Sequence, residues 1–182
     1  MTEKKVSLRY AKAMFEVAKE RDLLETCYND MQVIKNLIYS SRELRILLKS
    51  PIINKSKKKG VLENLFRSRV STLTYEFMNL LTEKQRESLI VDVVNQYDIL
   101  YNEAKNIQVV NISTAVELSE TIKQKLVVKL AEVTGKIIQP RYSTQKELVG
   151  GIMIRMDNWV YDATIAHQLD ILRQQLILGA KL

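Results

Sequence analysis

The fold is decided by the stretch VNIST at residues 110–114, where the spacing of the apolar side chains changes. In this stretch β-branched Val, Ile and Thr alternate with Asn and Ser, which is the period of a half-buried strand. Up to about residue 105 the apolar residues instead recur three and four positions apart, as on one face of a helix. The change predicts two domains, a helical one over residues 1–105 and a mixed one over residues 106–182.

Six amphipathic helices are predicted within residues 1–105. Pro51 ends the third of them near Ser50, because the residue before a proline avoids helical geometry. Short links between the helices favour a compact six-helix bundle. The apolar stripes of the first two helices are Tyr10, Ala11, Met14, Phe15 and Ala18, and then Leu24, Cys27, Met31, Ile34 and Ile38. The predicted capping pairs at helix starts are Asp22 with Glu25, Ser40 with Glu43 and Thr82 with Gln85. Ser71 is the predicted cap of the fifth helix.

The second domain is predicted to be a small α/β unit. After the first strand, a helix from about Ser119 ends at Gly135, which suits a left-handed C-terminal residue. Pro140 places the next strand, 136–142, at a sheet edge, and a hairpin turns at 157–158. The predicted class is therefore mainly α, a six-helix bundle followed by a small C-terminal α/β domain. Two apolar stripes mark its helices: Ile122, Leu126, Leu130 and Val133, then Ile165, Leu169, Leu172 and Leu176.

Charge leaves one alternative function open. The chain of 182 residues has a formal net charge of +7, which suits an anionic partner such as nucleic acid, lipid or an acidic protein. The one dense cluster is Lys55 with residues 57–59, for which a solvated helix start is the simpler interpretation. No aromatic and basic RNA motif accompanies it. A basic helical nucleic-acid-binding protein is nevertheless kept as the alternative hypothesis.

The residues that catalysis requires are missing from the sequence. A single cysteine, Cys27, and a single histidine, His167, leave no disulfide framework and too few nitrogen and sulfur ligands for zinc or copper. The glycine pair at residues 150–151 is not followed by the Lys-Ser/Thr of a phosphate loop. It instead predicts a close approach of two strands or a bulge. Asp157 and Asp162 are expected at a turn and a helix start. We therefore expect no catalytic residues, metal or cofactor; an enzyme on the α/β half would need a bound cofactor.

Two stretches resemble the ATP synthase delta subunit family, which includes the mitochondrial oligomycin-sensitivity-conferring protein. The first is RYAKAMFEVA at residues 9–18, and the second is ELVGGIMIR at residues 147–155, followed by Asp162 and the last helix. The order of these motifs, the length and the change of domain extend the resemblance over essentially the whole chain. Asn158 and Thr164 depart from the glycine-aspartate turn and the serine that the family usually has. Since Asn tolerates positive φ and Thr caps helices, the hairpin and helix start should survive.

The resemblance implies a non-catalytic stator that links the catalytic head to the peripheral stalk. It implies that domain 1–105 binds N-terminal helices of the alpha subunits and domain 106–182 binds the C-terminal end of the b subunit. It implies no cofactor, nucleic acid or small-molecule substrate. The candidate groove between the first and fifth helices is lined by Tyr10, Ala11, Met14, Phe15, Leu73, Phe77 and Leu80, and the candidate stalk contact by Trp159, Leu169, Leu172 and Leu176.

The alternatives for these residues remain open at this point. One apolar stripe cannot serve wholly as both bundle core and groove, so each groove candidate has a core role as its alternative. Trp159 has packing across the terminal hairpin as its alternative.

No apolar run approaches the ~20 residues that cross a bilayer, and residues 1–5 run straight into a helix without a signal peptide. The expected location is the cytoplasmic face of a bacterial membrane, peripheral and held there only through the complex.

Overall fold

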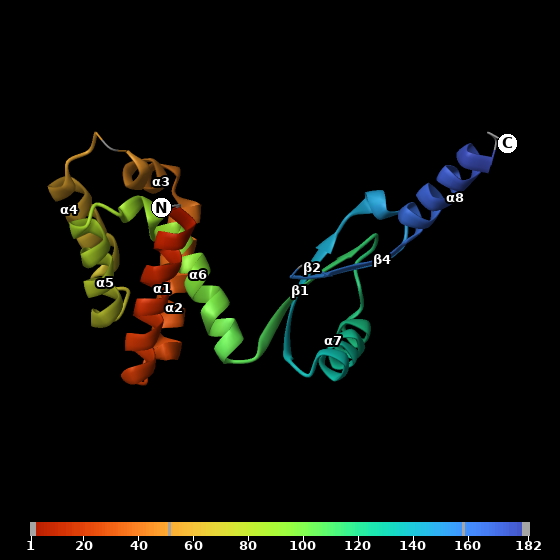
Figure 1. The fold of residues 1–182 in the computed structure, drawn as a ribbon, viewed down its shortest axis with the longest axis horizontal. Helices are drawn as coiled ribbons and strands as arrows, with labels where there is room; N and C mark the ends of the chain where they lie inside the picture. Colours follow the sequence, from red (N-terminus) through yellow and green to blue (C-terminus); the bar gives the residue numbers. More distant parts are fainter. Residues whose placement is uncertain (1–2, 51, 158, 180–182) are drawn as a thin grey trace. The chain divides into compact units, whose positions relative to one another are not determined.

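A computed structural model of the chain describes residues 3–50, 52–157 and 159–179. The chain divides into two compact units, Met1–Ala104 and Lys105–Leu182, one residue before the expected boundary. Figure 1 shows helices in the first unit and a small sheet with helices in the second. A mainly helical chain with a small C-terminal sheet is thus confirmed.

The first unit packs its helices around a core of apolar side chains from every long element. Phe15 and Tyr97 meet here with ring centroids 5.9 Å apart, and burial raises the pKa of the Tyr97 phenol above its ordinary value. One short 3-10 helix, η1, was not among the predicted elements. The elements are α1 (Glu3–Glu20), α2 (Leu24–Ser40), α3 (Arg42–Lys49), α4 (Lys55–Phe66), α5 (Thr72–Glu83), η1 (Glu87–Leu89) and α6 (Ile90–Ala104).

The three predicted capping pairs are wrong. Thr82 lies inside α5, where its hydroxyl donates to the Met78 carbonyl at 3.0 Å instead of starting a helix. The cap of α3 is Ser41, one residue after the predicted Ser40, and its hydroxyl accepts from Leu44 N. No described side chain caps the start of α2, and Asp22 adopts a positive φ of 55°. Spacing alone does not say which of several adjacent polar residues turns toward the free N–H groups.

Two other helix boundaries agree with the sequence. Ser71 caps α5 by accepting from Thr74 N, and α3 ends at Lys49, just before the residue preceding the proline. In the second unit, Gly135 ends its helix in the left-handed conformation with φ of 65°. These signals were right because each depends on a single residue type with one strong local preference.

The second unit is a four-stranded sheet in the order β2-β1-β3-β4. β1 and β2 are parallel, so the chain crosses between them through a helix, while the other pairs are antiparallel. Pro140 lies on edge strand β2, as predicted, and Asn158 of the predicted turn lies outside the described residues. The elements are β1 (Ile107–Thr114), α7 (Glu120–Thr134), β2 (Ile137–Thr144), η2 (Lys146–Leu148), β3 (Gly151–Met156), β4 (Trp159–Thr164) and α8 (Ile165–Gly179).

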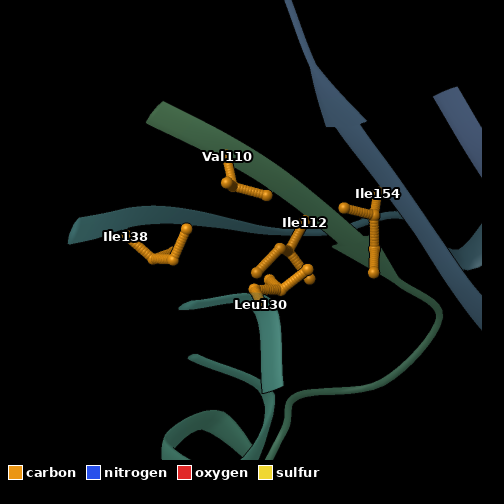
Figure 2. Packing of buried hydrophobic residues seen from close by; sticks show 5 residues of the cluster. All are labelled: Val110, Ile112, Leu130, Ile138 and Ile154. Carbon is orange, nitrogen blue, oxygen red and sulfur yellow. The ribbon is translucent and has the colours of Figure 1, made fainter. Parts of the chain in front are cut away.

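One face of this sheet is covered by α7. Figure 2 shows Leu130 of α7 close to Ile112 of β1, within a cluster completed by Val110, Ile138 and Ile154. The predicted buried stripe of α7 is partly wrong, because Ile122 is 52% exposed and Val133 is 85% exposed. The helix is rotated about its axis relative to the prediction, and the residues that pack on the cluster are Leu126, Val127, Leu130 and Ala131.

Gly151 confirms the expected close strand approach. Its φ is 78°, and a Cβ built on it would collide with the Ala163 carbonyl oxygen across the β3–β4 pair. We expect Gly151→Ala to destabilise the second unit by about 2–3 kcal/mol, since strain and steric clash add. Urea unfolding followed by the fluorescence of the single tryptophan, Trp159, measures this unit.

Gly60→Ala is the matched control, because a Cβ at Gly60 in α4 would meet nothing within 4 Å. In that helix alanine is expected to be neutral or to stabilise by up to about 1 kcal/mol. Equal stability of both variants and the parent would contradict the close approach at Gly151.

Candidate functional site: two apolar docking faces

An open groove runs between α1 and α5 of the first unit. Its cavity volume is about 820 Å³. Most lining side chains are apolar, and the charged ones balance, with two carboxylates and two guanidinium groups. The groove is lined by Glu3, Val6, Arg9, Tyr10, Ala13, Met14, Val17, Leu73, Glu76, Phe77, Leu80, Arg86 and Leu89.

Helix α1 lines this groove with a second apolar stripe beside the one it buries in the core. The buried residues of α1 include Ala11, Phe15 and Ala18, each 8% exposed or less. Val6, Tyr10, Ala13 and Val17 follow the same three-and-four spacing on the adjoining side of the helix and line the cavity. The second stripe is what separates a groove role from a core role.

The structure separates the groove and core roles only in part, because Met14 and Phe77 line the groove and are also buried, at 2% and 8% exposed. Ala11 and Phe15 belong to the buried core and are not among the lining residues. The prediction from sequence overlooked Val6, Ala13 and Val17, although the width of the apolar arc on α1 is a signal that would have found them. The other five candidates line the groove: Tyr10, Met14, Leu73, Phe77 and Leu80.

The dimensions of the groove suit one amphipathic helix. From Glu3 to Val17 it follows fifteen residues of α1, a rise of about 21 Å or four helical turns. Leu80 on the opposite wall is 42% exposed, so an apolar side chain reaches solvent in the free chain. Such a trough offers apolar pockets to anchor residues at helical spacing on a second polypeptide.

A buried carboxylate positions α5, the second wall of the groove. Asp30 of α2 is 8% exposed, and its Oδ2 accepts from Ser71 N at 2.9 Å, Ser71 Oγ at 2.6 Å and Thr74 Oγ1 at 2.7 Å. Three charge-assisted bonds therefore fix the start of α5 against α2. They tie the groove wall to the bundle core.

Replacing Asp30 by alanine is expected to destabilise the first unit by about 2–4 kcal/mol, because one buried donor from Thr74 and two part-buried donors from Ser71 lose their charged acceptor. Urea unfolding followed by far-ultraviolet circular dichroism measures the loss. Asp92→Ala removes an exposed carboxylate from α6 and serves as the control, with an expected change below about 0.5 kcal/mol. Matching midpoints for the two variants would show that the Asp30 network is not structural.

The second face lies on α8, whose described side chains are mostly exposed. Leu169, Leu172 and Leu176 are 55%, 54% and 74% exposed, although their spacing puts them on one side of the helix. With Arg173 and Ile177 they line a shallow depression of about 530 Å³. The stripe that the sequence predicted on the last helix is therefore present, but no described part of the chain covers it.

Trp159 of β4 adds an aromatic side chain to the exposed apolar surface of the second unit. It is 51% exposed and stacks on Tyr161, two residues along the same strand, with ring centroids 5.9 Å apart. Stacking along the strand differs from packing across the hairpin, which was the alternative role for this residue. Trp159 and Tyr161 are 51% and 50% exposed, so both aromatic side chains are accessible to a partner.

The start of α8 is fixed to β4 by Asp162 and Thr164. Thr164 Oγ1 accepts from His167 N at 3.2 Å, so threonine caps the helix as expected. Asp162 Oδ1 in turn accepts from Thr164 Oγ1 and Thr164 N, and these bonds lower the pKa of the Asp162 carboxyl. Because the folded pKa is depressed, this contribution to stability is present above the ordinary carboxyl pKa and is lost as pH falls through the folded value.

The lysine cluster lies at the start of α4, as predicted, and Lys55, Lys57 and Lys59 are exposed, but Lys58 is not solvated. Lys58 is buried, and its Nζ lies 2.5 Å from Glu87 Oε1 of η1. Lys55 Nζ donates to the Glu83 carbonyl at 3.1 Å, and Lys59 Nζ lies 3.9 Å from the Glu83 carboxylate. Much of this cluster therefore joins α4 to the α5–η1 segment.

The described residues hold no cluster suited to metal chemistry. Among residues 3–50, 52–157 and 159–179, no group of three or more His, Cys, Asp or Glu side chains could hold an ion. His167 is exposed on α8, as expected. Within the same ranges, no helix has both the length and the apolar character that crossing a bilayer demands.

Comparison with known proteins identifies the family. The profile of the family described as "ATP synthase delta (OSCP) subunit" matches residues 6–176. The chain belongs to the ATP synthase delta (OSCP) family. A protein of Chlorobaculum tepidum named ATP synthase subunit delta is 35% identical over 171 residues, 94% of each chain. One of the same name from Pelodictyon phaeoclathratiforme is 33% identical over 94% of this chain and 96% of its own.

The fold of the delta (OSCP) family is also found in a solved assembly. A chain in the cryo-electron microscopy structure of the Toxoplasma gondii mitochondrial ATP synthase hexamer superimposes with a TM-score of 0.76 at 25% identity, covering 97% of this chain and 98% of that one. Family membership makes the chain a non-catalytic stator subunit of ATP synthase, a peripheral part of a membrane-associated complex. It does not support the nucleic-acid-binding alternative.

Proposed function

We propose that the first unit binds N-terminal helices of the ATP synthase alpha subunits in the α1–α5 groove, while the second unit binds the C-terminal end of the b-subunit stalk. The observation that carries the proposal is the second apolar stripe of α1, which faces an open trough instead of the core. A stator must resist rotation of the catalytic head, and two separate docking faces on one chain meet that need without any catalytic group.

The α1–α5 groove favours a helix over an extended peptide or a small molecule. Its apolar lining extends for about four helical turns. The four charged side chains lie among the lining residues in equal numbers of each sign, so they select the orientation of a helix more than its net charge. Anchor residues at spacings of three and four on the alpha subunit would fill the space between Tyr10 and Leu80.

The α8 face favours a helical partner of a different kind. Leu169, Leu172 and Leu176 form a narrow stripe whose width suits the seam between two packed helices. The end of the b-subunit stalk would pack along this stripe, and Trp159, at the start of β4, is a further candidate contact. Because each unit has its own face, one partner can be lost without loss of the other.

The proposed location follows from these partners. The chain would lie on the cytoplasmic face of a bacterial cell membrane, held there through the complex and not by contact with lipid. No cofactor, nucleic acid or small-molecule substrate is needed for the role.

Leu80→Glu tests the groove. A carboxylate at this wall would be desolvated by an apolar helix, so affinity for a synthetic peptide from the N-terminus of the alpha subunit is expected to fall at least about ten-fold in titration calorimetry with the full chain. Ile99→Glu on α6 is the matched control, since Ile99 is 49% exposed against 42% for Leu80 and does not line the groove. Equal affinities of the two variants would rule out the α1–α5 groove as the binding site.

A further inference from the structure

The first unit carries another hollowed surface, formed by α3, residues 52–54 and the start of α4. It consists of two adjoining depressions of about 500 and 450 Å³ that share Lys49 and Ser50. None of its described lining residues belongs to the α1–α5 groove. We call it the basic surface and define it by Arg42, Arg45, Ile46, Lys49, Ile52 and Lys55.

The basic surface concentrates positive charge. Arg42, Arg45, Lys49, Lys55 and Lys58 line the two depressions, against one carboxylate among the described lining residues, Glu87. That carboxylate is already paired with Lys58 at 2.5 Å. The α1–α5 groove has equal numbers of each sign, so a positive excess is found here and not at that docking face. A surface of one sign steers oppositely charged partners toward it.

Exposed isoleucines lie among these cations. Ile46 of α3 is 57% exposed, and Ile52 in the link to α4 is 92% exposed. Arg45 is held in place because its guanidinium donates to the Ile38 and Tyr39 carbonyls at the end of α2. Apolar anchors surrounded by fixed positive charge suit a peptide segment that combines aliphatic and acidic side chains.

We propose that the basic surface binds an acidic amphipathic protein segment, with Asp or Glu side chains facing Arg42 and Lys49 and aliphatic side chains resting on Ile46 and Ile52. This interaction is separate from the α1–α5 groove and does not depend on the function proposed for it. Nucleic acid is disfavoured, because no aromatic side chain of the described residues lines either depression to stack on a base.

The test uses a synthetic helix of about 18 residues, five turns, with Glu on one face and Leu on the other. Titrated into the isotopically labelled full chain, it is expected to shift the NMR resonances of Ile46, Lys49 and Ile52, with affinity that falls as salt rises. Arg42→Glu with Lys49→Glu should weaken binding at least about ten-fold. Both side chains line the open depression and neither is buried, so folding is expected to be retained.

Lys12→Glu with Lys19→Glu is the matched control, since it makes the same change of net charge at exposed positions of α1. It should leave the affinity within about two-fold. The proposal is overturned if the peptide shifts only groove resonances, if the control weakens binding equally, or if no binding occurs. It is also overturned if vesicles of anionic phospholipid bind the chain through Arg42 and Lys49 and the peptide does not compete, because the occupant is then a lipid surface.

Discussion

Lys58→Ala is expected to destabilise the first unit by about 3–5 kcal/mol, more than the loss expected for Asp30→Ala. The Lys58 and Glu87 side chains are only 5% and 12% exposed, so removing the lysine leaves a mostly buried carboxylate without its charged partner. Glu87 Oε2 already lacks a hydrogen-bond partner among the described residues, so this carboxylate depends on Lys58. Urea unfolding followed by far-ultraviolet circular dichroism measures the change.

The double variant Lys58→Met with Glu87→Leu separates the ion pair from the packing of the two side chains. Replacing both partners by apolar residues of similar size is expected to cost less than about 1 kcal/mol or to stabilise the unit. If Lys58→Ala alone changes the free energy of unfolding by less than about 0.5 kcal/mol, the pair is solvated and does not join α4 to η1.

Changing Leu169, Leu172 and Leu176 together to glutamate is expected to weaken binding of a segment from the C-terminal end of the b subunit by more than about 100-fold, with little effect on folding. The reason is the exposure of 55%, 54% and 74% for these side chains, which leaves few contacts to lose within the chain. In the complex, three carboxylates would be desolvated against an apolar helix. Titration calorimetry measures binding, and Trp159 fluorescence in urea measures the stability of the second unit.

A triple glutamine-to-glutamate variant on the same helix controls for charge. Gln168→Glu, Gln174→Glu and Gln175→Glu add the same negative charge at exposed positions of α8 outside the leucine stripe. This variant should bind within a few-fold of the parent. Loss of binding in both triple variants would mean that net charge, and not the leucine stripe, governs the contact.

Much of the fold follows from local patterns in the sequence. The switch to a period of two at residues 110–114 marks β1, whose residues 108, 110, 112 and 114 are buried in alternation. Gly135, Ser71 and Pro140 each lie where their own chemistry requires. These features are predictable because one residue, or one short repeat, determines them without help from distant parts of the chain.

Features set by distant contacts were less predictable. The buried side of α7 depends on how the helix sits on β1 and β2, so the choice between Val133 and Val127 cannot be made from periodicity alone. The contact of Asp30 with the start of α5 shows the same limit, since it joins residues 41 positions apart in the chain. The spacing of apolar residues shows which side of a helix is apolar, whereas tertiary packing decides which part of that side is covered.

The docking residues were predictable in part, because local spacing marks them and tertiary packing decides whether they are exposed. The α8 stripe could be predicted directly from spacing, and its exposure became evident only once the sheet and α7 were seen to pack without it. On α1 the sequence indicated one stripe where the structure has two, so Val6, Ala13 and Val17 were missed. An apolar arc wider than one helix contact needs is the sequence signal of such a groove.

Methyl NMR of the full chain distinguishes two independent docking faces from any other arrangement. A peptide from the N-terminus of the alpha subunit is added first, and a segment from the C-terminal end of the b subunit is added second. The first addition should shift the methyl resonances of Val6, Ala13 and Leu80 and leave those of α8 unchanged. The second should shift Leu169, Leu172 and Leu176 alone. Shifts of both sets by either ligand, or of neither set by both, would contradict the presence of a separate helix-binding face on each unit.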